Sequence, residues 1–116
     1  MEIWINPACS KCRTATAALD EAGVEYTVRR YLDEPPTRAE LAEVLARLDL
    51  EPWQIVRTGE PEAAAVQELP RTPAAREAWV QAMVEHPQLI QRPIITADDG
   101  TAVLARDPET LAGLLD

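Results

Sequence analysis

The chain has 116 residues, of which 47% are hydrophobic and 27% charged, a composition typical of one folded domain with one core. A net charge of −9 argues against direct binding to nucleic acid or to an anionic membrane, because both would repel an acidic surface. The first residues contain neither a basic leader nor a long apolar stretch, so we expect a cytoplasmic protein with no membrane segment.

The N-terminal part of the sequence predicts a β-α-β unit. A short apolar strand over residues 2–5 leads through a turn to a helix over 11–22, which Gly23 ends in the left-handed conformation. The segment 24–30 alternates and is rich in Val, Thr and Tyr, which predicts a second strand. A right-handed crossover between the strands makes them parallel.

The middle of the chain predicts helices. After a Pro-Pro break, Thr37 and Glu40 form a capping box that begins a helix over 38–48. Four apolar residues share one face of this helix: Leu41, Val44, Leu45 and Leu48. A short helical or irregular piece is expected at 53–56.

Two more helices are predicted over 62–69 and 73–85. The second begins with Thr72 as N-cap and Pro73 at the first helical position. Its apolar stripe consists of Trp79, Val80, Met83 and Val84.

The C-terminal part predicts a β-β-α unit. Strands over 93–96 and 101–104 flank an Asp-Gly turn, and Asp107 caps a helix that buries Leu111, Leu114 and Leu115. This order of elements predicts an α/β chain with the thioredoxin-like fold, in which helices are inserted between the β-α-β and β-β-α units. We expect one domain over 1–116.

Cys9 and Cys12 are the only cysteines, and they stand at the start of the first predicted helix. Cys9 falls at the helix N-terminus, where unpaired N–H groups and the helix dipole favour a thiolate, the nucleophilic form. Cys12 follows one turn later and can resolve a mixed disulfide on Cys9. Lys11 and Arg13 add positive charge that lowers the cysteine pKa values.

Two other interpretations of the cysteine pair stay open. A zinc site needs further N or S ligands, and only His86 is left to offer one, so no metal is predicted. His86 itself stands where a helix C-terminal cap is expected. The cysteines could also be inert core residues, although the flanking cations favour redox chemistry.

Three segments resemble the ArsC family, the glutaredoxin-linked arsenate reductases and their relatives. These are Asn6-Pro7-Ala8-Cys9, the run from Tyr31 to Leu41, and the run from His86 to Ile94. They occur in the family's order with compatible spacing and cover nearly the whole chain. Their combination is far more specific than the Cys-x-x-Cys pair alone.

The resemblance implies that Cys9 is the nucleophile that attacks arsenate and that no cofactor is bound. It implies glutathione or another thiol as reductant, with glutaredoxin or thioredoxin restoring the thiol. Three arginines would hold the oxyanion, Arg57, Arg92 and Arg106, and the planar guanidinium fork suits this task. Asn6 and Pro93 would support the site, the Arg92–Pro93 bond being cis. The protein would work as a monomer.

The sequence departs from the family at two positions. Ile5 stands where a histidine often precedes the motif, and Cys12 gives the loop a second thiol. The dithiol is similar to that of Spx-type redox-sensing regulators, which bind RNA polymerase. A redox regulator and a general thiol–disulfide oxidoreductase of glutaredoxin type are therefore the alternatives to an arsenate reductase.

Overall fold

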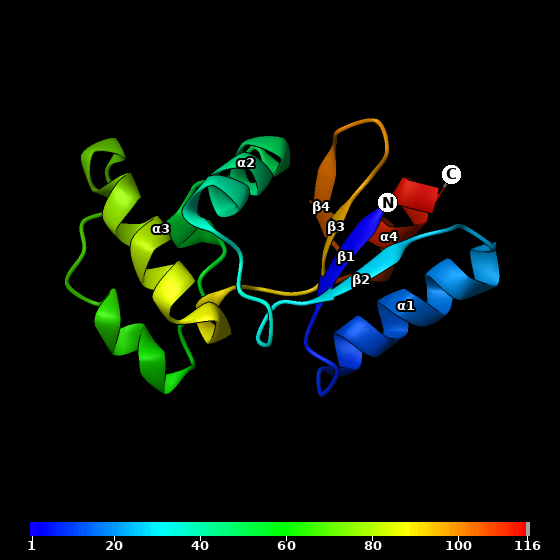
Figure 1. Cartoon of the computed structure of the whole chain (residues 1–116), viewed down its shortest axis with the longest axis horizontal. Helices are drawn as coiled ribbons and strands as arrows, with labels where there is room; N and C mark the ends of the chain where they lie inside the picture. The colour runs from blue at the N-terminus through cyan, green and yellow to red at the C-terminus, as the bar shows by residue number, and fades with distance from the viewer. Residues whose placement is uncertain (116) are drawn as a thin grey trace. The chain divides into compact units, whose positions relative to one another are not determined.

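A computed structural model describes residues 1–115 and divides the chain into two compact units (Figure 1). The first, here called the sheet unit, consists of Met1–Glu34 and the chain from Arg92 onward. The second, here called the helical unit, consists of Pro35–Gln91. The helical unit is thus inserted between the two sequence segments that build the sheet unit.

The sheet unit contains four strands and two α-helices. Their bounds are β1 Glu2–Ile5, α1 Ser10–Ala22, β2 Thr27–Arg30, β3 Ile94–Thr96, β4 Ala102–Leu104 and α4 Pro108–Leu115. The strands lie in the order β2-β1-β3-β4. The pair β1–β2 is parallel, which confirms the predicted parallel pairing, and β3 is antiparallel to both β1 and β4.

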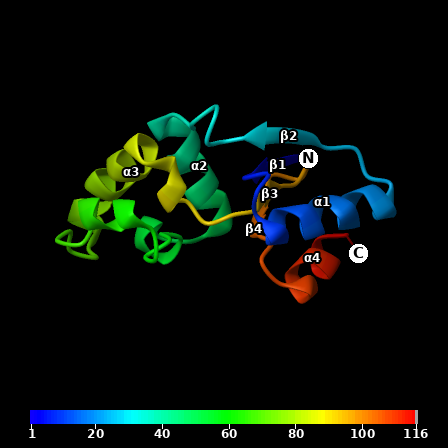
Figure 2. The same ribbon diagram turned by 90° about the horizontal axis from the view of Figure 1, so that it is seen from below.

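Helices α1 and α4 lie side by side on one face of this sheet (Figure 2). The core between them and the strands is apolar and includes Ile3, Ala15, Leu19, Ile95 and Leu111. These residues come from both ends of the chain. Hydrophobic burial therefore joins the N-terminal β-α-β segment to the C-terminal β-β-α segment.

The ends of the sheet-unit helices follow local signals. Gly23 ends α1 with φ 72°, as predicted, because glycine, which has no Cβ, adopts the left-handed backbone conformation with the least steric strain. The N–H of Val24 then donates to the carbonyl of Leu19 at 3.3 Å. The predicted strand from residue 24 was wrong at its start: β2 begins at Thr27, because the cap uses the Val24 N–H. Asp107 caps α4, its Oδ1 accepting from the Thr110 N–H at 2.7 Å.

The predicted hairpin between β3 and β4 is confirmed. The N–H of Ala97 donates to the carbonyl of Thr101 at 2.8 Å, and Gly100 has φ 90° in the turn. Asp99 Oδ1 accepts from the N–H and hydroxyl of Thr101 at 2.9 and 2.6 Å. These bonds set the register of the two strands.

The helical unit contains α2 Arg38–Leu48 and α3 Arg76–Glu85, with four short 3₁₀ helices at Pro52–Gln54, Pro61–Ala65, Pro73–Ala75 and Pro87–Leu89. The capping box of α2 is confirmed: Thr37 Oγ1 accepts from the Glu40 N–H at 3.1 Å, and Glu40 Oε1 accepts from the Thr37 N–H at 2.9 Å. The predicted apolar stripes of both helices are buried, except that Leu48 and Val84 are half-buried.

The predicted helix over 62–69 was wrong. The chain forms only the 3₁₀ helix Pro61–Ala65, followed by turns whose hydrogen bonds span three residues, from Val66 to Ala63 and from Leu69 to Val66. Pro70 follows and disfavours helical geometry at the residue before it. The helix predicted over 73–85 is divided, because it begins as 3₁₀ and Thr72 makes no side-chain cap bond.

Within residues 1–115, none of the helices combines the length and the apolar character that crossing a bilayer requires.

Candidate functional site

Cys9 lies at the N-terminus of α1, after a tight loop that follows β1. Its N–H donates to the carbonyl of Asn6 at 2.9 Å, and the N–H of Ala8 donates to Asn6 Oδ1 at 3.0 Å. Cys9 is the N-cap residue, and its carbonyl accepts the first helical hydrogen bond, from the Arg13 N–H at 3.2 Å. The thiol of Cys9 therefore stands at the positive end of the helix dipole.

The predicted supporting residues differ in what they contact. Asn6 holds the loop through both of its oxygens, as described above. Arg13 is exposed, and its Nη1 donates to the Pro7 carbonyl at 3.2 Å, which ties the helix back to the loop. The Lys11 side chain is exposed, while its backbone N–H faces Cys9 as a hydrogen-bond donor.

The pKa of Cys9 is lowered to about 7. Burial is the largest effect and raises this pKa, because it disfavours the charged thiolate. Hydrogen bonds from the Cys12 backbone and thiol, the Lys11 N–H and the Arg92 guanidinium together outweigh it. A substantial fraction of Cys9 is thiolate at neutral pH.

Cys12 has the opposite character. Its side chain is 1% exposed, and burial, as the largest effect, raises its pKa to about 11. The Asn6 backbone lowers this pKa, but the hydrogen bond to Cys9 and the negative charge of Cys9 raise it. Cys12 is thus a protonated thiol that donates to the Cys9 thiolate, so the two cysteines are chemically distinct.

Arg92 is the buried cation beside Cys9. It is 8% exposed, and the peptide bond from Arg92 to Pro93 is cis, which confirms that expectation. Burial lowers the pKa of Arg92, but Tyr31 and Cys9 raise it and the net shift is upward, so the guanidinium keeps its charge. Nη1 donates to the Tyr31 hydroxyl at 3.3 Å. The buried Nε has no hydrogen-bond partner among the described residues.

Arg106 lies next to Arg92. Its side chain is half-buried, and Nη1 donates to the carbonyl of Arg92 at 2.6 Å. Two of the three predicted arginines are therefore joined within the sheet unit.

Arg57 belongs to the helical unit, after the buried Val56. Its N–H donates to the Leu89 carbonyl at 2.7 Å, while Nε and Nη1 donate to Glu60 and Gln91 side-chain oxygens, each at 3.3 Å. These contacts orient the guanidinium within its own unit. Membership of Arg57 in the site stays a prediction.

Tyr31 is a site residue that was not among those predicted. This tyrosine follows β2 directly and is fully buried, with its hydroxyl on Arg92. In the sequence, Tyr31 could be noticed only as an aromatic residue with a hydroxyl group in one of the segments that resemble the family. Only the fold brings that hydroxyl to Arg92.

His86 is the C-cap residue of α3, as expected. In the part of the chain that the structure describes, no cluster of three or more His, Cys, Asp or Glu side chains could hold a metal.

Together these groups form a thiolate with a thiol donor beside it and a buried guanidinium with a free N–H. A thiolate is a nucleophile, and a buried N–H without a partner favours an acceptor oxygen. The arrangement suits attack on an oxyanion.

Comparison with known proteins gives three consistent similarities. The sequence model of the ArsC family matches residues 4–114. The chain is 58% identical over 99% of its length to "Uncharacterized protein in glnII region" of Streptomyces viridochromogenes, covering 98% of that protein. It is 40% identical over 97% of its length to an arsenate reductase of Rhizobium meliloti, covering 79% of that protein.

A solved structure of an arsenate reductase from Vibrio cholerae is similar over 98% of both chains, with a TM-score of 0.84 and 32% sequence identity. The thioredoxin-like fold of the chain is thereby confirmed.

Proposed function

The chain belongs to the ArsC family, and from that premise we propose that it is a thiol oxidoreductase that reduces arsenate to arsenite through Cys9. Relatives named arsenate reductase, at 31 to 40% identity, support this substrate. The observation that carries the proposal is the juxtaposition of Cys9, whose pKa is lowered to about 7, with the buried Arg92, whose Nε lacks a partner among the described residues.

In the first step the Cys9 thiolate attacks the arsenic of arsenate. A sulfur–arsenic bond forms, and one arsenate oxygen leaves as hydroxide and takes up a proton to become water. Arg92 would hold an equatorial oxygen through its Nε, since a charged N–H donor lowers the energy of the added negative charge. Arg106 is the further donor within the sheet unit that we assign to the oxyanion.

In the second step a thiol attacks the Cys9 sulfur. A disulfide forms and the sulfur–arsenic electron pair passes to arsenic, which leaves as arsenite and takes the thiol proton on an oxygen. Two thiols lose two electrons and arsenic gains them, so the step balances.

We assign the second thiol to Cys12. It lies one helical turn from Cys9, within hydrogen-bond reach. Once the Cys9 sulfur is bonded to arsenic, the thiolate charge that raises the pKa of Cys12 is gone, while the Arg92 charge that lowers it remains. The Cys12 thiol therefore becomes easier to ionise at the stage at which it must attack. Glutaredoxin with glutathione, or thioredoxin, would then reduce the disulfide.

The test is arsenite production by the purified, reduced protein with either reductant system supplied in parallel. The wild-type protein is expected to turn over with at least one system, and Cys9→Ser with neither. Cys12→Ser separates two routes: loss of activity assigns the second thiol to Cys12, and full activity with glutathione assigns it to glutathione.

A protein that produces no arsenite, yet forms a Cys9–Cys12 disulfide reversibly, would overturn the reductase proposal. That result would favour the redox regulator or the general thiol–disulfide oxidoreductase.

A further inference from the structure

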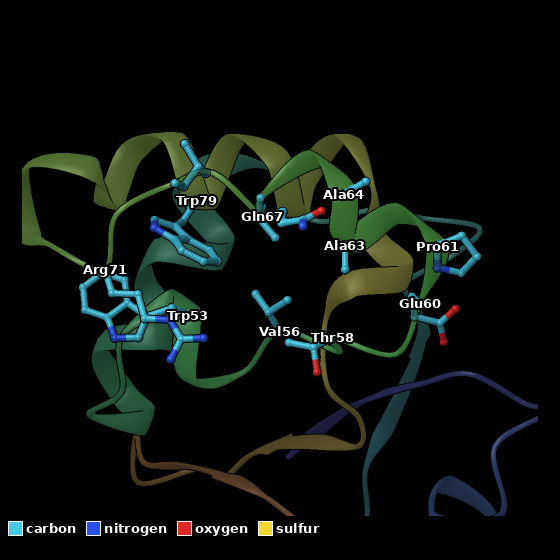
Figure 3. A pocket seen from close by; sticks show the side chains of 12 residues that line it. Trp53, Val56, Thr58, Glu60, Pro61, Ala63, Ala64, Gln67, Arg71 and Trp79 are labelled. Atoms are coloured by element: carbon cyan, nitrogen blue, oxygen red, sulfur yellow. The ribbon is translucent and has the colours of Figure 1, made fainter.

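The helical unit contains a pocket of about 460 Å³, in the size range of small-molecule sites. Its aromatic wall consists of Trp53 and Trp79, which contact each other edge to face with ring centroids 6.1 Å apart. Figure 3 shows the Trp79 ring and the Val56 side chain pointing toward the same space. None of these residues takes part in the chemistry of Cys9 proposed above.

The wall of this pocket is preformed. Trp79 is 4% exposed, and its Nε1 donates to the Pro70 carbonyl at 2.8 Å, so its ring is fixed and its only N–H is used. Val56 and Val66, which also line the pocket, are buried. The pocket therefore has a fixed aromatic wall, which favours a flat ring, within a lining that also contains polar side chains such as Thr58 and Gln67.

The charge available at the pocket is positive. Arg71 lines it, and its guanidinium has no hydrogen bond or ion pair among the described residues, although the chain has 20 acidic and only 11 basic residues. Glu60 is the one carboxylate of the described lining, and it is paired with Arg57. Figure 3 shows Arg71 beside Trp53, at the end of the pocket opposite Glu60.

We propose that this pocket binds a small planar aromatic anion, with the ring against Trp53 and Trp79 and the carboxylate or sulfonate on Arg71. Ring burial supplies the affinity, and the unpaired guanidinium selects the anion over a neutral molecule of the same shape. The proposal is independent of arsenate reduction, because its residues and its ligand class are different.

The experiment is titration calorimetry of the full chain with two probes of nearly equal shape, 2-naphthoate and its neutral analogue 2-naphthamide. We expect both probes to bind and the anion to bind about tenfold more tightly, as one charged hydrogen bond predicts. Equal affinities, or no binding of either probe, would overturn the proposal.

Two substitutions locate the binding. Arg71→Gln should weaken naphthoate about tenfold and leave naphthamide unchanged. Arg47→Gln is the matched control, because it removes the same charge from an exposed position that does not line the pocket, and it should leave both affinities unchanged. Trp53→Leu should weaken both probes. Naphthoate binding that is unaffected by Arg71→Gln would show that the anion is held elsewhere.

Discussion

The backbone carbonyl of Arg92 accepts a hydrogen bond at 2.6 Å from the guanidinium of Arg106. The bond orients Arg106 on the same backbone segment that carries the Arg92 guanidinium and the cis bond to Pro93. Arg106 is thereby held as a second cationic donor next to the segment that carries Arg92, as the proposed oxyanion site requires.

Arg106→Gln should therefore raise the KM for arsenate about tenfold or more, since the variant loses one charged donor to the oxyanion. A smaller effect on kcat is expected, because Cys9 keeps its own hydrogen bonds. Steady-state arsenite production measures both constants, and Arg47→Gln is the control for charge alone. A variant with unchanged KM would remove Arg106 from the site.

Tyr31→Phe should lower the free energy of unfolding by about 1–3 kcal/mol, because the buried Nη1 of Arg92 loses the hydroxyl oxygen that accepts its hydrogen bond. Urea denaturation measures this change. Tyr26→Phe is the matched control, since the Tyr26 hydroxyl donates to Asp20 at an exposed position. Equal effects of the two variants would mean that Tyr31 does not support Arg92.

The alkylation rate of Cys9 should rise with pH and reach half its maximum near pH 7, because only the thiolate reacts and the pKa is lowered to about 7. The pKa of Cys9 in the folded protein lies below the ordinary value of about 8.5. Ionisation of the Cys9 thiol therefore stabilises the folded protein. This stabilisation is fully present above pH 8.5 and is lost as the pH falls through 7. Iodoacetamide labelling followed by mass spectrometry gives the profile, and a midpoint near 8.5 would contradict it.

Cys12→Ala should move this midpoint upward, because the Cys9 thiolate loses the thiol that donates to it. Cys12→Ser keeps a donor at the same position and should move the midpoint less. The comparison isolates the hydrogen bond from the size of the side chain. Identical midpoints for the two variants would mean that the Cys12 side chain does not activate Cys9.

Thr37→Ala should cost about 1 kcal/mol of stability, because the hydroxyl of Thr37 caps the N–H of Glu40 at the start of α2. Thr72→Ala is the control, since Thr72 also precedes a helix but makes no side-chain cap bond. Thermal denaturation of both variants tests the difference. Similar losses would mean that the cap at Thr37 contributes nothing beyond the residue change.

Features with a local cause could be predicted from the sequence. The cap at Thr37, the left-handed Gly23 and the Asp-Gly hairpin each depend on residues within a few positions of one another, and all three are confirmed. The prediction of a helix over 62–69 was wrong. Composition favoured a helix there, but the backbone hydrogen bonds of this segment span three residues and Pro70 follows it.

In the candidate site, too, local features could be predicted from the sequence and long-range contacts could not. The position of Cys9 at a helix N-terminus follows from the short loop after β1, so it could be predicted. The contact of Tyr31 with Arg92 could not, because the two residues are 61 positions apart and only the paired strands bring them together.

The antiparallel pairing of β1 with β3 has a consequence for protein synthesis. Cys9 is translated before the helical unit, and the strand that follows Arg92 is translated only after the whole of that unit. Until that strand joins the sheet, the nascent chain carries the cysteine loop without its buried cation. Full activation of the thiol is therefore delayed until the whole helical unit and Arg92 have been translated.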